Sequence, residues 1–99
     1  MCAVITPEIL MMHNLLTTRR YSELLDYCSS ILGKDPLNLE ALKYNVYSFY
    51  FLRRYEKAVL CYDKLIKLEP GNPSHYAGKS KALEKLHKFA EAKACYEQA

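Results

Sequence analysis

The chain has 99 residues, of which 51% are hydrophobic and 25% are charged, and its formal net charge is +3. This composition is that of one small globular domain and argues against disorder, while the mild charge argues against nucleic acid as the partner. No apolar run approaches the roughly 20 residues that cross a bilayer, and the N-terminus lacks the basic start and apolar stretch of a signal peptide.

The first predicted unit contains two helices. Thr6-Pro7-Glu8 is a helix start, because threonine caps a helix and proline is tolerated in its first turn. Gly33 followed by Pro36 is the predicted stop of the second helix. Asn38 is a good N-cap for the helix that follows, in which apolar residues recur at i, i+4 and i+7, namely Leu42, Val46 and Phe49.

Further helices complete the chain. The polar step Arg53-Arg54 interrupts the apolar pattern, and a second stretch from 55 to 68 presents one broad apolar face. Pro70-Gly71 ends that stretch, and Asn72-Pro73 starts the next helix. The last helix is predicted to begin near Phe89.

A shift of 34 residues superimposes these units. It aligns Pro36 with Pro70, Asn38 with Asn72, Arg20 with Arg54 and Lys88, and Tyr21 with Tyr55 and Phe89. Connections of two to five residues make consecutive helices antiparallel neighbours, and each hairpin needs its neighbours to bury its second face. The sequence therefore predicts an all-α stack of units 5–38, 39–72 and 73–99, with the last unit incomplete.

This pattern resembles the tetratricopeptide repeat family. The residues that fit the family's packing positions are Tyr21, Tyr55, Ala58, Tyr62, Pro70, Phe89, Ala92 and Tyr96. Leu24 stands at a further packing position, where it replaces a small residue. The resemblance implies a right-handed superhelical solenoid of antiparallel helix-turn-helix units. It also implies a non-catalytic protein-interaction module, an adaptor or scaffold, without cofactor or metal.

The incomplete third unit leads to a further expectation. The chain stops at Ala99, before the proline that the pattern would place next, and Ala90, Ala94 and Cys95 look like a docking surface for another helix. We therefore expect the chain to be the N-terminal part of a longer protein. Stacking on a second copy through the same surface is the alternative.

The resemblance also implies a site, because the first helices of this family line a concave groove that binds extended peptides. The residues carried over to that groove are Ile9, His13, Lys43, Tyr47, Tyr50, Lys81 and Lys85. They suit a peptide with an apolar anchor and an acidic residue. In the competing interpretation, the tyrosines simply pack against adjacent helices or against an N-terminal segment.

One subset of the family grips chaperone C-terminal tails with a five-residue carboxylate clamp of lysine, arginine and asparagine. The residues that we match to the clamp are Ile9, His13, Tyr47, Ala77 and Lys81. Only Lys81 supplies a comparable charge, and the side chains of Ile9 and Ala77 have no donor. The sequence therefore argues against chaperone tails as partners.

The cysteines indicate a reducing compartment, such as the cytoplasm. None of the four lies within four residues of another, which argues for reduced structural thiols, with a disulfide or a metal site as the alternative. His13, His75 and His87 have no partner at ligand spacing, so a metal site is not expected.

Other functions are less favoured. A cluster of lysines at 79, 81, 85 and 88 is a solvated face or a contact for an acidic partner. RNA binding, known in related helical repeats, is disfavoured by the mild charge. Enzymatic activity is not expected, because the serines lack a nucleophile context and so small a chain has no stability to spare for a large cavity.

Overall fold

The computed structural model describes residues 6–98. Within this range the chain forms six helices and no strand, as the periodicity predicts. The helices are α1 (Pro7–Thr17), α2 (Tyr21–Lys34), α3 (Leu39–Phe51), α4 (Tyr55–Leu68), α5 (Pro73–Lys85) and α6 (Phe89–Gln98).

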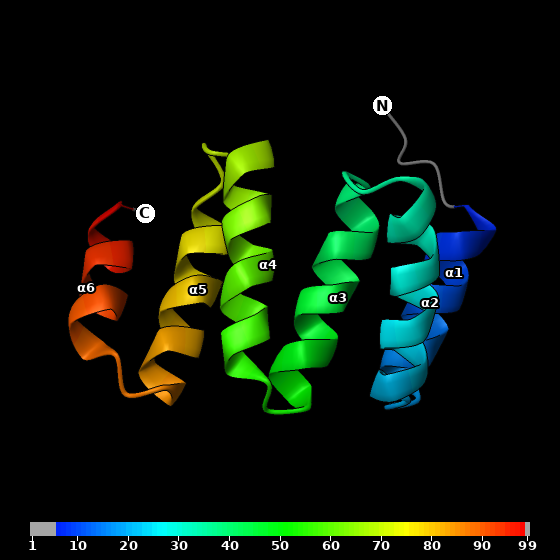
Figure 1. Ribbon diagram of the computed structural model, residues 1–99, viewed down its shortest axis with the longest axis horizontal. Helices are drawn as coiled ribbons and strands as arrows, with labels where there is room; N and C mark the ends of the chain where they lie inside the picture. Colours follow the sequence, from blue (N-terminus) through cyan, green and yellow to red (C-terminus); the bar gives the residue numbers. More distant parts are fainter. Residues whose placement is uncertain (1–5, 99) are drawn as a thin grey trace.

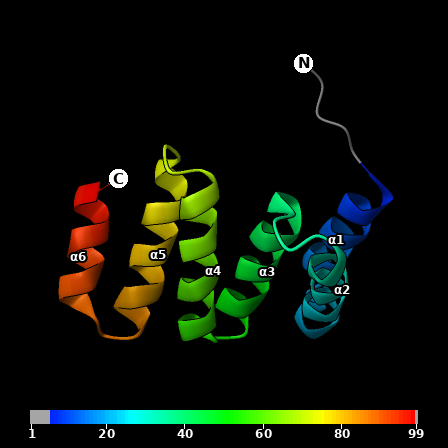
Figure 2. The same cartoon turned by 45° about the horizontal axis from the view of Figure 1, so that its top comes forward.

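The helices form a row of antiparallel neighbours that measures 40 × 31 × 22 Å (Figure 1). The turns α1–α2, α3–α4 and α5–α6 lie along one edge of the row, and the turns α2–α3 and α4–α5 lie along the opposite edge (Figures 1 and 2). The row therefore has two edges, each made of turns from successive units.

Capped starts open the first helix of each unit. The side-chain oxygen of Thr6 accepts from the Ile9 amide at 3.2 Å, and that of Asn38 accepts from the Ala41 amide at 3.0 Å. Asn72 accepts from the Ser74 amide, also at 3.0 Å. These bonds satisfy amides that have no partner inside the helix, and they confirm the three predicted starts.

The turns within each unit repeat one backbone geometry. Arg19, Arg53 and His87, spaced 34 residues apart, have φ values of 60°, 61° and 61°. After each, the next amide donates to a carbonyl five residues earlier, at 2.9, 2.8 and 2.9 Å. This left-handed closure with a six-to-one bond is the Schellman motif, which ends a helix by satisfying its last carbonyls. The predicted break at Arg53-Arg54 and the 34-residue repeat are confirmed.

The opposite turns are set by proline. Asp35 and Glu69 cap α2 and α4 with extended φ values of −137° and −133°, because the ring of the following proline disfavours the helical conformation. Gly33 lies inside α2, so the prediction that it helps to stop this helix is wrong. Pro36 and Pro70 are the residues that end these two helices.

The core is divided along the row. One cluster joins α1, α2 and the start of α3 (Met12, Leu15, Leu24, Cys28 and Ala41), a second joins α3 and α4 (Leu42, Val46, Cys61 and Leu65), and a third joins α5 and α6 (Leu83, Ala92 and Cys95). Each helix pair thus buries its inner face against its neighbours, as stacking requires.

Cys28, Cys61 and Cys95 are free and buried. Burial raises the pKa of the Cys28 thiol to about 12 and also raises that of Cys61, because an apolar surrounding disfavours the thiolate. Cys2 lies outside the described residues. None of the helices in the described part of the chain is both long and apolar enough to cross a membrane.

Candidate functional site

The largest gathering of predicted site residues lies between α3 and α5, over α4. An open pocket of about 410 Å³ is lined by Tyr47, Tyr50, Phe51, Tyr62, Ser74, Ala77, Gly78 and Lys81. Two tyrosines from α3 and one lysine from α5, all predicted for the groove, therefore line the same pocket.

A second hollow of about 250 Å³ adjoins the first and shares three residues with it. Its lining is Lys43, Val46, Tyr47, Tyr62, Leu65, Asn72, Ser74 and His75. We call the two hollows together the α3–α5 groove. The groove combines aromatic rings with the ammonium groups of Lys43 and Lys81, which suits a ligand that carries both apolar and anionic groups.

The floor of the groove depends on a glycine in α5. A Cβ atom built on Gly78 would lie 2.4 Å from both Cζ and the hydroxyl oxygen of Tyr62. Glycine is therefore needed for α5 to approach the ring of Tyr62 this closely.

The tyrosines of the groove differ in exposure. Tyr47 is 44% exposed and meets the ring of Tyr44 edge to face at a centroid distance of 6.3 Å. Tyr50 is half-buried against Tyr55, with ring centroids 5.4 Å apart. Burial, with a smaller effect of Tyr47 and Tyr50, raises the pKa of Tyr62 to about 12.

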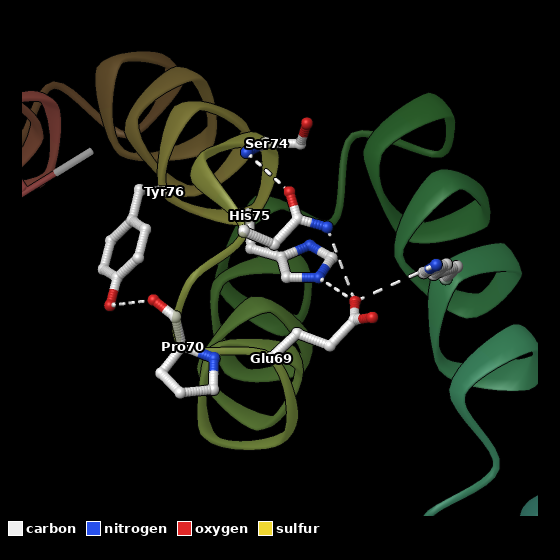
Figure 3. A network of polar contacts seen from close by, with 7 residues as sticks. Glu69, Pro70, Ser74, His75 and Tyr76 are labelled. Atoms are coloured by element: carbon white, nitrogen blue, oxygen red, sulfur yellow. Dashed lines mark hydrogen bonds and ion pairs between the residues drawn. The ribbon is translucent and has the colours of Figure 1, made fainter.

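One end of the groove is organised around the Glu69 carboxylate (Figure 3). Its Oε1 atom lies 2.7 Å from His75 Nε2, 3.5 Å from Asn72 Nδ2 and 3.9 Å from Lys43 Nζ. These contacts, the hydrogen bond with His75 above all, hold the pKa of Glu69 below its ordinary value. The network ties α3 to the α4–α5 turn and orients Lys43 beside the groove.

The same turn is closed by a weaker contact outside the groove, in which the Tyr76 hydroxyl donates to the Pro70 carbonyl at 3.5 Å (Figure 3). Among residues 6–98, no group of three or more histidine, cysteine, aspartate or glutamate side chains is arranged to hold a metal ion.

Comparison with solved structures identifies this architecture. The first TPR domain of Spaghetti (RPAP3), bound to the HSP90 peptide SRMEEVD, superimposes with a TM-score of 0.81 over 96% of this chain and 79% of that one, at 20% sequence identity. The chain has the tetratricopeptide repeat fold. The resemblance inferred from the sequence is confirmed at the level of the fold.

Among curated proteins, the repeat domain is similar to intraflagellar transport protein 70A2 of Rattus norvegicus, with 29% identity over 80 residues. The match covers 81% of this chain but only 12% of that protein. No protein-family model matches the chain.

The structural neighbour also bears on one prediction. That protein is bound to a chaperone-derived peptide. The comparison therefore does not support our prediction that this chain does not bind chaperone tails. The prediction rests on the side chains of this sequence alone.

The structure separates the remaining predicted groove residues from the α3–α5 groove. Ile9 lines a different hollow, of about 460 Å³, together with Tyr27 and Ile31. His13 and Lys85 are exposed and line neither hollow of the groove. The predicted site is thus divided, with its compact part on α3 and α5.

The predicted packing residues also divide. Leu24, Ala58 and Ala92 are buried, whereas Phe89 and Tyr96 are 61% and 47% exposed. For these two rings the expectation of packing is corrected, because α6 has α5 as its neighbouring helix and no helix on its outer side among the described residues.

The other predicted packing residues are less buried. Tyr21, Tyr55 and Tyr62 are half-buried, and Pro70 is exposed in the turn that it forces. Cys95, expected on the outer docking surface, is buried against Leu83 and Ala92 instead. Ala90 and Ala94 are exposed, as expected.

Sequence reasoning missed the role of His75, for which it noted only that no partner stands at metal-ligand spacing. It is 5% exposed and has Glu69 as its partner. The sequence did contain a signal for this role. His75 lies on the apolar face of its helix one turn after the Asn72 cap, and the acidic residue Glu69 stands six residues before it. Lys79, assigned to a lysine cluster, instead contacts Asp63 of α4 at 2.6 Å.

Proposed function

We propose that this chain is a non-catalytic protein-interaction module that binds a partner peptide or helix in the α3–α5 groove. The observation that carries the proposal is the convergence of Tyr47, Tyr50 and Lys81 on one open pocket. Aromatic side chains give large contact area at small entropic cost, and the lysine adds an anion contact at the rim.

The chemistry of the groove defines the partner. Lys43 and Lys81 lie at its two hollows, so a ligand with an apolar anchor flanked by carboxylates fits best. The chaperone peptide SRMEEVD, bound by the structural neighbour, has this character, although the clamp positions of this chain hold only one lysine. This peptide is therefore a useful probe of the groove alongside unbiased peptides.

The test is selection of peptides from a displayed library on the immobilised chain, followed by fluorescence anisotropy with the selected peptide and with SRMEEVD. We expect Tyr47→Ala to weaken the selected peptide roughly tenfold, as truncation of an aromatic anchor does. Tyr96→Ala is the matched control, because Tyr96 has a similar exposure, 47% against 44%, on the distant α6. Equal affinity in both variants would refute the groove as the site.

A second candidate function is self-assembly through α6. Two large aromatic side chains of this helix, Phe89 and Tyr96, are 61% and 47% exposed and could be covered by a second copy of the chain. Light scattering across a concentration series tests this candidate. A Phe89→Ser variant that stays monomeric where the parent associates would support it, and a parent that is monomeric at every concentration would remove it.

A further inference from the structure

The edge that carries the turns α1–α2, α3–α4 and α5–α6 is basic (Figure 1). The equivalent segments 17–23, 51–57 and 85–91 hold seven lysines and arginines against three glutamates. The seven are Arg19, Arg20, Arg53, Arg54, Lys57, Lys85 and Lys88, and all are exposed. Since the whole chain has a formal charge of only +3, its positive charge is concentrated along this edge.

The position of the basic residues is not explained by local backbone stability. Arg19, Arg53 and His87 have positive φ values of 60–61°, a conformation that glycine adopts without steric cost and asparagine at lower cost than arginine. A basic residue nevertheless stands at this point in all three turns. This residue is the first member of an arginine pair in the first two turns and of a histidine–lysine pair in the third.

The central arginines are available to a ligand. Within residues 6–98, Arg53 and Arg54 make no ion pair, whereas Arg20 contacts Glu23 at 3.7 Å. Arg54 also stands at the start of α4, where no side chain caps the helix. The partial positive charge of that helix end lies beside the partial negative charge of the C-terminal end of α3, so the positive charge of this turn comes from the arginines themselves.

An apolar hollow lies among these charges. It has a volume of about 330 Å³ and bridges two successive turns, with Arg53, Arg54, Tyr55, Glu56 and Lys57 from one side and Leu86 from the other. It shares no lining residue with the α3–α5 groove. The ring of Tyr55 and the side chain of Leu86, both half-buried, form its apolar part.

We propose that this edge is a second binding surface, for an acidic segment of a partner protein. An apolar side chain of that segment enters the hollow between Tyr55 and Leu86, and flanking carboxylates pair with Arg53 and Arg54. Arginine forms two parallel hydrogen bonds with a carboxylate, which favours this pairing.

A protein segment fits the edge better than a nucleic acid or a membrane does. Glu23, Glu56 and Glu91 place one negative charge in each turn segment, and they would repel a continuous phosphate backbone or an anionic lipid surface. A peptide avoids this repulsion, because its carboxylates occupy discrete positions.

The test is fluorescence anisotropy with a labelled, C-terminally amidated peptide, Glu-Glu-Phe-Glu-Glu. Arg53→Asn/Arg54→Gln should weaken its binding roughly fivefold or more, since asparagine tolerates the left-handed conformation and each exposed pair contributes modestly. Lys34→Gln/Lys67→Gln is the matched control, because it removes two exposed charges from the opposite edge. All affinities are measured in the Tyr47→Ala/Lys81→Gln background, because the α3–α5 groove is proposed to bind peptides of the same chemistry. In that background the control should bind the peptide as the chain with the unchanged edge does.

Several results would overturn the proposal. They are equal weakening in the two charge variants, loss of all peptide binding in the Tyr47→Ala/Lys81→Gln background while the edge is unchanged, and equal binding in that background of a Glu-Glu-Ser-Glu-Glu peptide that lacks the apolar anchor. Tighter binding of a 20-nucleotide oligouridine or of phosphatidylserine vesicles than of the peptide would assign the edge to that partner instead. Because the groove is inactivated in every one of these measurements, failure of this proposal is distinguishable from failure of the groove.

Discussion

Replacing Asn45 by leucine should stabilise this protein. Asn45 lies in the core side of α3 with 8% of its surface exposed, and its Oδ1 atom is buried without a hydrogen-bond partner. Its Nδ2 atom donates only to the sulfur of Cys61, at 3.5 Å. Leucine has the same number of side-chain heavy atoms and the same branch at Cγ, so Asn45→Leu replaces two polar atoms by two methyl groups in similar places.

The size of the effect follows from four contributions. Removing an unpaired buried acceptor is worth about 1–3 kcal/mol, and each buried methyl group contributes about 0.8 kcal/mol. The lost contact with Cys61 costs less than about 1 kcal/mol, and the larger methyl groups add about 1 kcal/mol of packing strain. The free energy of unfolding should therefore rise by about 1–2 kcal/mol, which raises the Tm by about 5–10 °C for a domain of this size.

The assay is thermal and urea denaturation followed by circular dichroism at 222 nm. Ser48→Ala in the same helix is the control, because Ser48 is fully buried but its hydroxyl donates to the Tyr44 carbonyl at 3.0 Å. It removes a satisfied polar group and should change stability by less than about 1 kcal/mol. An Asn45→Leu variant that is no more stable than the parent would refute the reasoning, since the unpaired oxygen would then cost nothing.

Three further predictions concern α5, the α4–α5 turn and the first core cluster. Gly78→Ala should displace the Tyr62 ring, whose Cζ lies 2.4 Å from the added Cβ, and so weaken the groove peptide roughly tenfold or more, as measured by anisotropy. Glu69→Gln should lower the urea midpoint at pH 7 by removing the ionised partner of His75; because the folded pKa of Glu69 is depressed, the difference persists above roughly pH 4.3 and disappears as the pH falls through the folded value. The Cys28 thiol, with its pKa raised to about 12, should react with a thiol reagent at pH 8 only after unfolding.

Each of these predictions has a contradicting outcome. Gly78→Ala with wild-type affinity would show that the Tyr62 ring moves without reshaping the pocket, and Tyr62→Leu in the same background should relieve the clash. A Glu69→Gln deficit that is unchanged at pH 3 would mean that the carboxylate charge is not responsible. Rapid modification of Cys28 in the native protein would show that the first core cluster opens readily.

The helical framework could be predicted almost completely from the sequence, because its signals are local. Asn38 and Asn72 cap helices through their own side chains, and Pro36 and Pro70 restrict the residue before them. The error at Gly33 arose because glycine was interpreted as a stop where the following proline is sufficient. The grouping of Tyr47 with Lys81 was predictable too, since equivalent helices of a repeat present equivalent faces.

The unpredicted features are contacts between residues that are distant in the sequence. The distance between a Cβ atom added at Gly78 and the ring of Tyr62 depends on how closely α5 approaches α4. The exposure of Phe89 depends on which helices surround α6. Nothing in a local pattern reports such distances, because the same repeat pattern serves buried and terminal positions alike.

The sequence by itself thus determined the helices, their order and their 34-residue repeat, because capping, proline restriction and hydrophobic periodicity act over a few residues. Only the tertiary structure decided that Tyr62 and Gly78 line the same pocket as Lys81, and only it paired His75 with Glu69. It also placed the α3–α4 turn, which holds Arg53 and Arg54, on the same edge as the turns α1–α2 and α5–α6. Those arrangements follow from how successive hairpins stack, and stacking is decided by packing between helices rather than within them.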